Sequence, residues 1–595
     1  MLQFWKRFST WQLALILALV VFCVYVPSFF NSFIWDDEQF ITRNLFTTSW
    51  QYLPRIFITN TIAGAGEISN YYRPLTTVSF LIDRLIWGLT PFGFHLTNTL
   101  MHIGVMILFF YLLLRLGVGK TQSSVIALIY GLHPLHTEAV TYINSRGDSL
   151  YGFWLLLGLL AFDTALQKQK WQVRFERSTH NFDSIFLTVL AVVSFIISLL
   201  CKEIALAGIG LYLLLAVYRW WQYRTKIIST FSWSVLKIVF VSLLVVIALY
   251  VGLRLTVLNF NNVLNFYAAE NEYTSNVLVR FLTFCRIVFI YFKLIVLPYP
   301  LHMERDIPFE TSVVSIWLLG LCASILTWLS ASYVEWKSKH SWFILGGGLW
   351  FIGMLVPVSG IVPINGLLYE HWLYVPLMGV LLAAVGLGKL IPQPLKKMIF
   401  NLSWVWMIAL AVVTVRQNWL WRQPIPFYTY TLRYGQSARL YNNLAMAYSA
   451  EGDEEKAIEN YQKALTISNA YPQIYYNLAR SYLDLGQIDK ATQSAMTSIQ
   501  TNPEFDYAYL FLIDFYMQQR NYQLVIPLAQ KMYQKYPNDL KIGLVYGQAL
   551  AQTKQSNMAE KVWQEVYQQS GFDAQVLQTI SSLKQTASPA AQQQK

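Results

Sequence analysis

Three consecutive carboxylates, Asp36, Asp37 and Glu38, follow the first long apolar run of the chain. The aromatic residues Trp35 and Phe40 flank them. A carboxylate held near a membrane surface can act as a general base toward a hydroxyl group of a substrate bound there. The alternative is a solvated loop that carries negative charge on the outer side of a membrane. The residue types alone leave both interpretations open.

A second polar group begins with a histidine-rich stretch at the end of another apolar run. Two histidines and a glutamate of this stretch could in principle bind zinc. Their spacing differs from that of the His-Glu-x-x-His motif, however, and Pro134 interrupts a helix that would present them. We therefore favour a polar wall of a substrate cavity, or a hydrogen-bonded loop, over a metal site. The substrate-binding residues assigned here are His133, His136, Glu138, Arg146 and Asp148.

Charged residues next to other apolar runs complete the candidate site. Arg73, Lys202 and Arg305 could neutralise a lipid phosphate at the membrane surface. Arginine suits this role because its guanidinium donates two parallel hydrogen bonds. The alternative for each cation is snorkelling from a helix end or a local ion pair, and both interpretations stay open for Lys202 beside Glu203. The other residues assigned to substrate binding are Glu38, Glu203, Glu370 and His371.

Apolar segments dominate the chain before about residue 423. Hydrophobic residues make up 55% of the 595 residues and charged residues 13%, whereas soluble domains carry roughly 25% charged residues. A helix needs roughly 20 apolar residues to cross a membrane. The candidate segments are 11–30, 95–116, 121–139, 149–166, 185–201, 204–219, 232–256, 277–297, 312–333, 342–358, 370–391 and 398–416.

The formal net charge of +12 follows this membrane pattern. Lysines and arginines gather at the ends of the apolar segments, as at Lys6 and Arg7, in the stretch 168–177, and at Lys396 and Lys397. The positive-inside rule places basic residues at such positions. The charge therefore indicates membrane lipids as a partner and argues against nucleic acid.

The segment 277–297 determines the number of crossings. It contains three basic residues, and the basic loops at 335–341 and 392–397 share the cytoplasm with the N-terminus only if it does not cross. We therefore interpret it as an interfacial or re-entrant helix. Eleven crossings then remain, and the C-terminal domain lies outside the cytoplasm. The segment 11–30 is expected to be a retained signal anchor, because no small-residue cleavage site follows it.

The last quarter of the chain repeats with a period of 34 residues, which is typical of tetratricopeptide repeats. Small residues recur where two helices cross, and Leu and Tyr fill the groove between them. About four repeats fit between 438 and 570, and the last two are degenerate. The clearest repeated residues are Asn443, Leu444, Gly452 and Ala457, which recur as Asn477, Leu478, Gly486 and Ala491.

These patterns predict an all-α chain. A polytopic membrane domain covers 1–423, a linker 424–437, a tetratricopeptide solenoid 438–585 and a disordered tail 586–595. The sequence contains no P-loop, no Gly-rich dinucleotide turn and no Gly-x-Ser-x-Gly elbow. Any active site is therefore expected in the membrane domain.

Several motifs resemble those of GT-C glycosyltransferases, which use sugars linked to polyprenyl phosphate. The acidic stretch from Trp35 to Glu38 resembles the acidic motif of the first outer loop in that family. The other motifs, with the trailing repeats, are similar to the TMTC group of O-mannosyltransferases and their prokaryotic relatives, over nearly the whole chain. They are Tyr72-Arg73-Pro74-Leu75, His133-Pro134-Leu135-His136-Thr137-Glu138-Ala139-Val140, Ser145-Arg146-Gly147-Asp148, Lys202-Glu203 and Glu370-His371-Trp372-Leu373-Tyr374-Val375-Pro376.

The resemblance implies that Asp36 and Asp37 form the catalytic pair, without deciding which is the base. It implies an inverting transfer of mannose or another hexose from a polyprenyl phosphate to Ser or Thr hydroxyls. The repeats would recruit the acceptor protein, and no cofactor or metal is expected. His371 stands where relatives tend to have Arg, and residues 301–306 match the family less closely, so the donor-binding details stay open.

Two other functions are compatible with the sequence. A non-catalytic membrane scaffold would use the repeats to assemble partner proteins, and the acidic pair would then be dispensable. A transporter would carry inverted repeats and charges at the bilayer midplane, whereas the charges here collect at loop ends. We expect a prokaryotic plasma membrane with the repeats on the extracytoplasmic side, or the endoplasmic reticulum membrane if the chain is eukaryotic.

Overall fold

The computed structural model describes residues 7–167, 171–175, 178–182, 184–228, 230–260, 272–361 and 366–587. Lys6, part of the basic stretch 168–177 and nearly all of the predicted tail 586–595 lie outside these residues. The chain forms two compact units, Met1–Gly435 and Gln436–Lys595, which are described separately. The boundary falls within the segment predicted as a linker, most of which belongs to the first unit.

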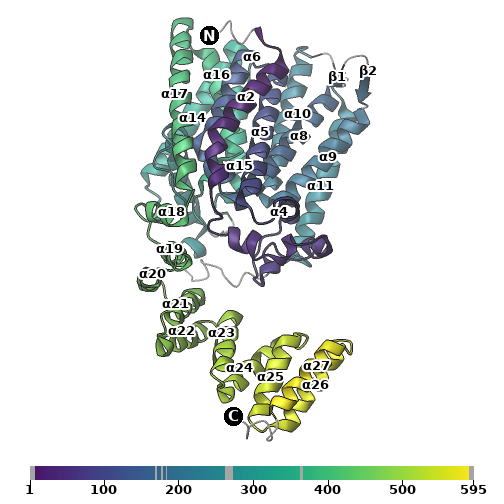
Figure 1. Cartoon of the computed structure of the whole chain (residues 1–595). Helices are drawn as coiled ribbons and strands as arrows, with labels where there is room; N and C mark the ends of the chain where they lie inside the picture. The colour runs from purple at the N-terminus through teal and green to yellow at the C-terminus, as the bar shows by residue number, and fades with distance from the viewer. Residues whose placement is uncertain are drawn as a thin grey trace. The chain divides into compact units, whose positions relative to one another are not determined.

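Among the described residues of the first unit, eight helical segments are long and apolar enough to cross a membrane. Apolar side chains cover their exposed sides; Leu326 of α14, for example, is 66% exposed. Such surfaces suit lipid rather than water. Figure 1 shows most of these helices running roughly side by side. They are α2 (Thr10–Tyr25, continued by a 3-10 turn to Phe30), α5 (Pro91–Arg115), α8 (Arg146–Leu166), α9 (Ser184–Cys201), α10 (Gly208–Arg224), α11 (Trp233–Leu255), α14 (Ile316–Lys339) and α17 (Gln393–Leu420).

Four further helices fill the other predicted segments, so each of the candidates contains a helix. They are α6 (Lys120–Leu132), α13 (Val277–Val296), α15 (Phe343–Leu355) and α16 (Pro376–Leu390). The helices α15 and α16 pack with their backbones in contact, because a Cβ atom on Gly347 would lie 2.4 Å from the carbonyl oxygen of Gly379. Whether α13 crosses the membrane stays a prediction.

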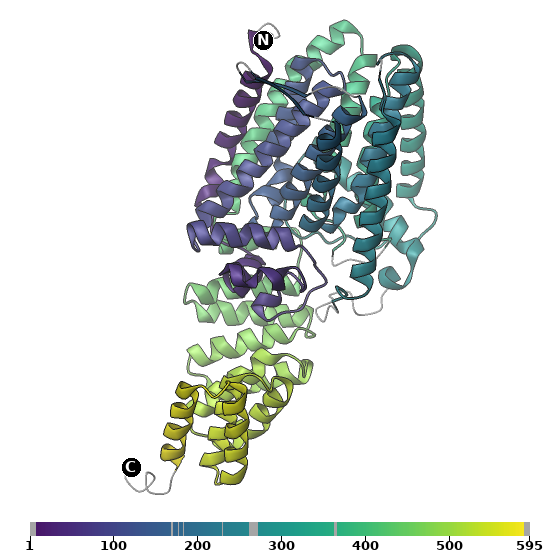
Figure 2. The same ribbon diagram turned by 90° about the vertical axis from the view of Figure 1, so that its right-hand side faces the viewer.

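The long connection between α2 and α5 contains helices that the apolar pattern did not predict. The short α3 (Leu53–Ile56) is followed by α4 (Pro74–Trp87), and Figure 2 shows α4 lying crosswise to the bundle helices. One face of α4 buries Phe80 and Leu81, while Ile86 on the other is 63% exposed. The helix is amphipathic, so a search for continuous apolar runs misses it.

The remaining elements of the first unit are short. They include the helices α7 (Thr137–Val140), α12 (Glu272–Ser275) and α18 (Pro424–Thr431). Among the described residues, one antiparallel pair of strands, β1 (Trp171–Phe175) and β2 (Ser178–Phe182), accompanies the helices that dominate the chain, as predicted.

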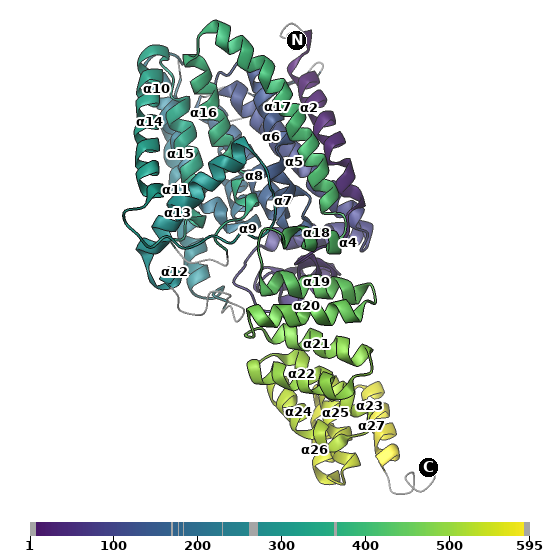
Figure 3. The same ribbon diagram turned by 90° about the vertical axis from the view of Figure 1, so that its left-hand side faces the viewer.

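The second unit is a stack of four helix pairs closed by one more helix, which confirms the predicted tetratricopeptide repeats. Figure 3 shows the successive pairs. Alanines at the crossing points, such as Ala457 and Ala491, are fully buried, because a small side chain lets two helices approach closely. The helices are α19 (Ala438–Ala450), α20 (Glu454–Ile467), α21 (Pro472–Asp484), α22 (Ile488–Thr501), α23 (Asp506–Gln518), α24 (Tyr522–Lys535), α25 (Leu540–Gln552), α26 (Ser556–Gln569) and α27 (Ala574–Ala587).

The turn between the two helices of each pair explains why the last two repeats look degenerate. Gly452 and Gly486 have φ angles of 81° and 70°, in the left-handed region that glycine adopts readily. Arg520 and Lys554 occupy the same position in the third and fourth repeats, with φ angles of 57° and 64°. The backbone repeats every 34 residues even where the glycine does not.

Candidate active site

The acidic loop after α2 holds Asp37 in a buried position. The Asp37 side chain is 1% exposed; its Oδ2 atom accepts the N–H of Ile34 at 3.0 Å, and its Oδ1 atom accepts the N–H of Asn144 at 2.9 Å. Burial raises the pKa of the Asp37 carboxyl to about 8, against the opposite effect of these two N–H groups. Asp37 therefore ties the loop to the start of α8.

Asp36 lies beside it and is only half-buried. The N–H of Asp36 donates to the Tyr142 hydroxyl at 3.2 Å, and the N–H of Trp35 donates to the Tyr428 hydroxyl at 3.0 Å. Trp35 has a φ of 61°, a left-handed conformation that is uncommon for a residue with a large side chain. The backbone is thus held on both sides of the turn that presents the Asp36 carboxylate.

Glu38 points to a different environment. Its carboxylate lies 3.5 Å from the guanidinium of Arg43, and both side chains are more than 40% exposed. Ion pairs at this exposure contribute little to stability. Glu67 is a further carboxylate that the sequence did not indicate. Burial raises the pKa of Glu67 to about 7, and the negative charges of Asp36 and Glu38 act in the same direction.

Arg146, at the start of α8, is fully buried, and its guanidinium contacts residues of α4 and α5. Its guanidinium forms an ion pair with Asp83 of α4 at 2.5 Å, and its Nε donates to the Asn98 side chain of α5 at 2.5 Å. It also lies over the ring of Phe80, 4.7 Å from the ring centre. Arg146 therefore joins α4, α5 and α8 beneath the acidic loop.

Two ion pairs connect the ends of α8 and α9 with the chain just before α4. Lys202 binds the carboxylate of Asp148 at 2.7 Å, and both side chains are at most 4% exposed. Arg73 binds both oxygens of Glu203, with its Nε and Nη2 atoms each 2.9 Å away. The adjacent Lys202 and Glu203 therefore each pair with a distant residue, and the local ion pair considered for them does not form.

Glu138, in α7, organises the turn that precedes α16. Its Oε2 atom accepts the N–H groups of Glu370 and His371 at 2.7 and 3.2 Å, and its Oε1 atom lies 2.8 Å from Nδ1 of His371. The carboxylate of Glu370 in turn binds the Arg305 guanidinium and accepts the N–H of His302 at 2.9 Å. One chain of contacts thus links α7, this turn and the loop that contains Arg305.

The two histidines of the polar stretch lie in the core. His133 is fully buried, and its Nε2 atom lies 3.0 Å from the carbonyl oxygen of Ile295. His136 is packed against the rings of Tyr130 and Tyr374, with centroid distances of 4.4 and 4.8 Å. Among the described residues, no group of three or more His, Cys, Asp or Glu side chains has a geometry that could hold a metal ion.

The acidic loop and the basic residues meet at Tyr71. The Arg73 guanidinium lies over the Tyr71 ring, 4.4 Å from its centre, and Tyr71 packs against the apolar cluster that contains Phe40 and Ile41 of the acidic loop. Direct contacts thus join the predicted residues in pairs, which are Arg73 with Glu203, Lys202 with Asp148, Glu138 with His371 and Glu370 with Arg305. Arg146, His133 and His136 are fully buried, and Asp148, Glu138, Glu370 and Lys202 are at most 4% exposed.

Sequence reasoning missed residues that hold the predicted site residues in place. Asp83 lies on the buried face of an amphipathic helix, where a lone carboxylate signals a buried partner. Tyr142 and Tyr428 accept backbone N–H groups of the acidic loop from positions 106 and 393 residues away in sequence. No local pattern could have indicated them.

Two family models match the second unit. One is described as a TPR repeat and matches residues 445–486, and the other is described as a tetratricopeptide repeat and matches residues 472–505. Among solved structures, the protein MamA is 18% identical with a TM-score of 0.23, and the match covers 25% of this chain and 86% of MamA.

The relatives that extend into the membrane unit share one name. The chain is 25% identical over 524 residues to the mouse protein O-mannosyl-transferase TMTC3, which is 83% of this chain and 55% of the relative. It is 24% identical over 503 residues to the Drosophila melanogaster protein O-mannosyl-transferase Tmtc3, with coverages of 71% and 51%. The chain spans about half the length of these curated relatives. It is therefore similar, over most of its own length, to proteins named protein O-mannosyl-transferase, and its C-terminal unit carries tetratricopeptide repeats.

Proposed function

We propose that the chain is a membrane glycosyltransferase that transfers mannose or another hexose from a polyprenyl phosphate to Ser or Thr hydroxyls of proteins. One observation carries the proposal. The Tyr71 ring packs against the apolar cluster that contains Phe40 and Ile41, just after the half-buried Asp36, and the guanidinium of Arg73 lies over that ring, so we infer that a base and a phosphate-binding cation share one site. The names of the relatives support the same class of enzyme.

Asp36 is the better candidate for the base. Both oxygens of Asp37 accept backbone N–H groups and its side chain is buried, so Asp37 supports the loop. In the proposed step, the Asp36 carboxylate takes the proton of the acceptor hydroxyl while the hydroxyl oxygen bonds to the anomeric carbon. The bond from that carbon to the phosphate oxygen breaks, and its electrons leave with the polyprenyl phosphate. One base suffices, and the anomeric configuration inverts.

The leaving phosphate requires positive charge that is fixed in place. Arg73 engages Glu203 through Nε and Nη2, which leaves Nη1 as a donor for a phosphate oxygen. The buried Nε of Arg305 has no hydrogen-bond partner among the described residues. These two guanidinium groups, with Lys202, are proposed to bind the phosphate, and their carboxylate partners keep them oriented in its absence.

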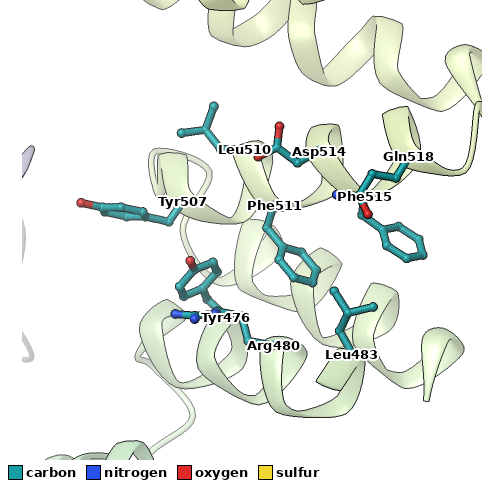
Figure 4. Close-up of a pocket in the computed structure, with 9 residues that line it drawn as sticks. All are labelled: Tyr476, Arg480, Leu483, Tyr507, Leu510, Phe511, Asp514, Phe515 and Gln518. Carbon is teal, nitrogen blue, oxygen red and sulfur yellow. The ribbon is translucent and has the colours of Figure 1, made fainter. Parts of the chain in front are cut away.

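The second unit offers a place for an acceptor segment. A cavity of about 250 Å³ lies between α21 and α23, and Figure 4 shows aromatic rings from both helices among the side chains that line it. Arg480 and Asp514 contribute opposite charges at its edge. A cavity of this kind suits a bulky apolar side chain of an extended peptide. We propose that it recruits the acceptor protein, on the extracytoplasmic side of a plasma membrane or in the lumen of the endoplasmic reticulum.

The test is transfer of radiolabelled sugar from a polyprenyl-phosphate donor by membranes that contain the chain. Wild-type membranes should label protein, and Asp36→Asn should lower the initial rate by about 100-fold or more, since a general base contributes roughly 10²–10⁴-fold. The matched control is Glu272→Gln, the same carboxylate-to-amide change at an exposed position of α12, which should transfer at the wild-type rate.

Other outcomes would separate the alternatives. Equal rates for wild type and Asp36→Asn would remove the proposed mechanism. No transfer by any variant, together with stable partners on the repeats, would favour the scaffold. Protease treatment of sealed vesicles would test the sidedness, because cleavage of the repeats from the cytoplasmic face alone contradicts the proposed arrangement.

A further inference from the structure

The backbone that presents Asp36 is held by an unusual arrangement. Trp35 adopts a left-handed φ of 61°, a conformation that persists in a bulky residue only where the surroundings impose it. The positions of the Asp36 and Asp37 carboxylates, which follow Trp35, therefore depend on contacts that fix this turn. Those contacts come from elements that lie far away in sequence.

We propose that Tyr428, on α18, is a positioning residue for the Asp36 carboxylate; this inference rests on the proposed role of Asp36 as the base. The Tyr428 hydroxyl accepts the Trp35 N–H at 3.0 Å. The rings of the two residues also lie against each other, with their centres 5.7 Å apart. Tyr428 thus fixes both the backbone and the side chain of the residue that forms the turn.

A packed group of aromatic rings fixes Tyr428 itself. Phe427, its neighbour on α18, packs against Trp421 at a centroid distance of 4.3 Å. Trp421 stacks on Tyr142 at 5.5 Å with an interplanar angle of 24°, and the Tyr142 hydroxyl accepts the N–H of Asp36. The acceptors of two successive loop N–H groups therefore belong to one aromatic unit, and all four rings are at most 4% exposed.

The C-terminal end of the segment 421–434 contacts the part of the site that contains Arg305. Tyr434 stacks on His302, with ring centres 4.7 Å apart and planes 11° apart. The N–H of His302 donates to the carboxylate of Glu370, which binds Arg305. The segment 421–434 thus contacts both the loop of the base and the loop of a phosphate-binding cation, and it holds the two at a fixed separation.

The experiment uses the full-length protein and the variant Tyr428→Phe, which removes the hydroxyl and keeps the ring. We expect kcat for transfer from polyprenyl-phosphate sugar to fall by about 5- to 30-fold, the size of one lost buried hydrogen bond. The KM values for donor and acceptor should change by less than about twofold, because the Tyr428 side chain is buried. Hydrogen–deuterium exchange of the peptide 31–40 should become faster.

A hydroxyl that only stabilises the fold would give a different pattern, in which the melting temperature falls while kcat and the exchange of peptide 31–40 stay unchanged. Tyr212→Phe is the matched control, since the buried Tyr212 hydroxyl donates to the carbonyl oxygen of Ala191 at 2.9 Å between bundle helices. This variant should lower the melting temperature and leave kcat and the exchange of peptide 31–40 unchanged. Tyr142→Phe, which removes the adjacent acceptor, should reproduce the effect of Tyr428→Phe and serves if that variant folds poorly.

The proposal is overturned if Tyr428→Phe keeps wild-type kcat, or if kcat falls without faster exchange of peptide 31–40. It is also overturned if Tyr212→Phe lowers kcat as much. If wild type transfers no sugar, the proposed function fails, but exchange still decides the positioning. Exchange of peptide 31–40 that is faster in Tyr428→Phe than in wild type and in Tyr212→Phe then supports the role of the hydroxyl in holding the loop. Unchanged exchange in Tyr428→Phe refutes it.

Discussion

Replacement of Asp37 should destabilise the acidic loop and change its dependence on pH. Asp37→Asn keeps the shape of the side chain but offers one acceptor oxygen where the N–H groups of Ile34 and Asn144 need two. A buried donor left without a partner costs about 1–3 kcal/mol. We therefore expect the free energy of unfolding to fall by about that amount near neutral pH.

The pH dependence follows from burial of the carboxyl, which raises its pKa to about 8 in the folded state. A folded pKa above the unfolded value means that the folded protein holds the proton more tightly. The resulting stability is present at low pH and is lost as the pH rises through about 8. Between pH 6 and pH 9 the melting temperature of wild type should therefore fall. Asp37→Asn has no carboxyl at this position, so its melting temperature should lack the decrease that titration of Asp37 causes.

The assay is thermal unfolding of detergent-solubilised protein at several pH values, with exchange of peptide 31–40 as a local measurement. Glu272→Gln, at an exposed site, controls for the change in net charge and should follow the wild-type profile. The reasoning is refuted if Asp37→Asn and wild type lose melting temperature in parallel between pH 6 and pH 9. A loss of stability without faster exchange in the loop would also refute it.

Three further outcomes follow from the same contacts. Lys202→Met should lower stability by about 3–5 kcal/mol because it leaves the buried Asp148 unpaired, and adding Asp148→Asn should restore part of the loss in thermal unfolding. Lys554→Gly should stabilise the repeat unit by about 1 kcal/mol, because glycine relieves the left-handed backbone; an unchanged or lower midpoint in unfolding of residues 436–587 would contradict this. Phe511→Ala, in the cavity between α21 and α23, should raise KM for an acceptor protein several-fold at constant kcat, and an unchanged KM would count against acceptor docking there.

The features that sequence predicted well are those with a local signal. Continuous apolar runs predicted all eight described helical segments that are long and apolar enough to cross a membrane, since the bilayer demands roughly 20 apolar residues in a row. The 34-residue period predicted the helix pairs, because Gly452 and Gly486 mark the same left-handed turn. The amphipathic α4 escaped prediction because its apolar residues lie on one face only.

The contacts of the candidate site had no such signal. The sequence left open a local ion pair at Lys202 and Glu203, yet each of them binds a residue that is distant in sequence. The proposed roles of Asp36 and Asp37 differ because Asp37 is buried against the start of α8, while Tyr428 holds the turn before Asp36. Contacts between residues 100 or more positions apart in sequence determine this difference in burial, and the types of the neighbouring residues do not predict it.

In the proposed function, this chain transfers sugar from a lipid phosphate with Asp36 as the base. The most direct measurement is transfer by purified protein in liposomes that contain polyprenyl-phosphate mannose, with Ser- and Thr-containing peptides analysed by mass spectrometry. The account predicts hexose on Ser or Thr with wild type, and at least about 100-fold less with Asp36→Asn, while Glu272→Gln matches wild type. Equal modification by wild type and Asp36→Asn, or none by either while the protein stays folded, would contradict it.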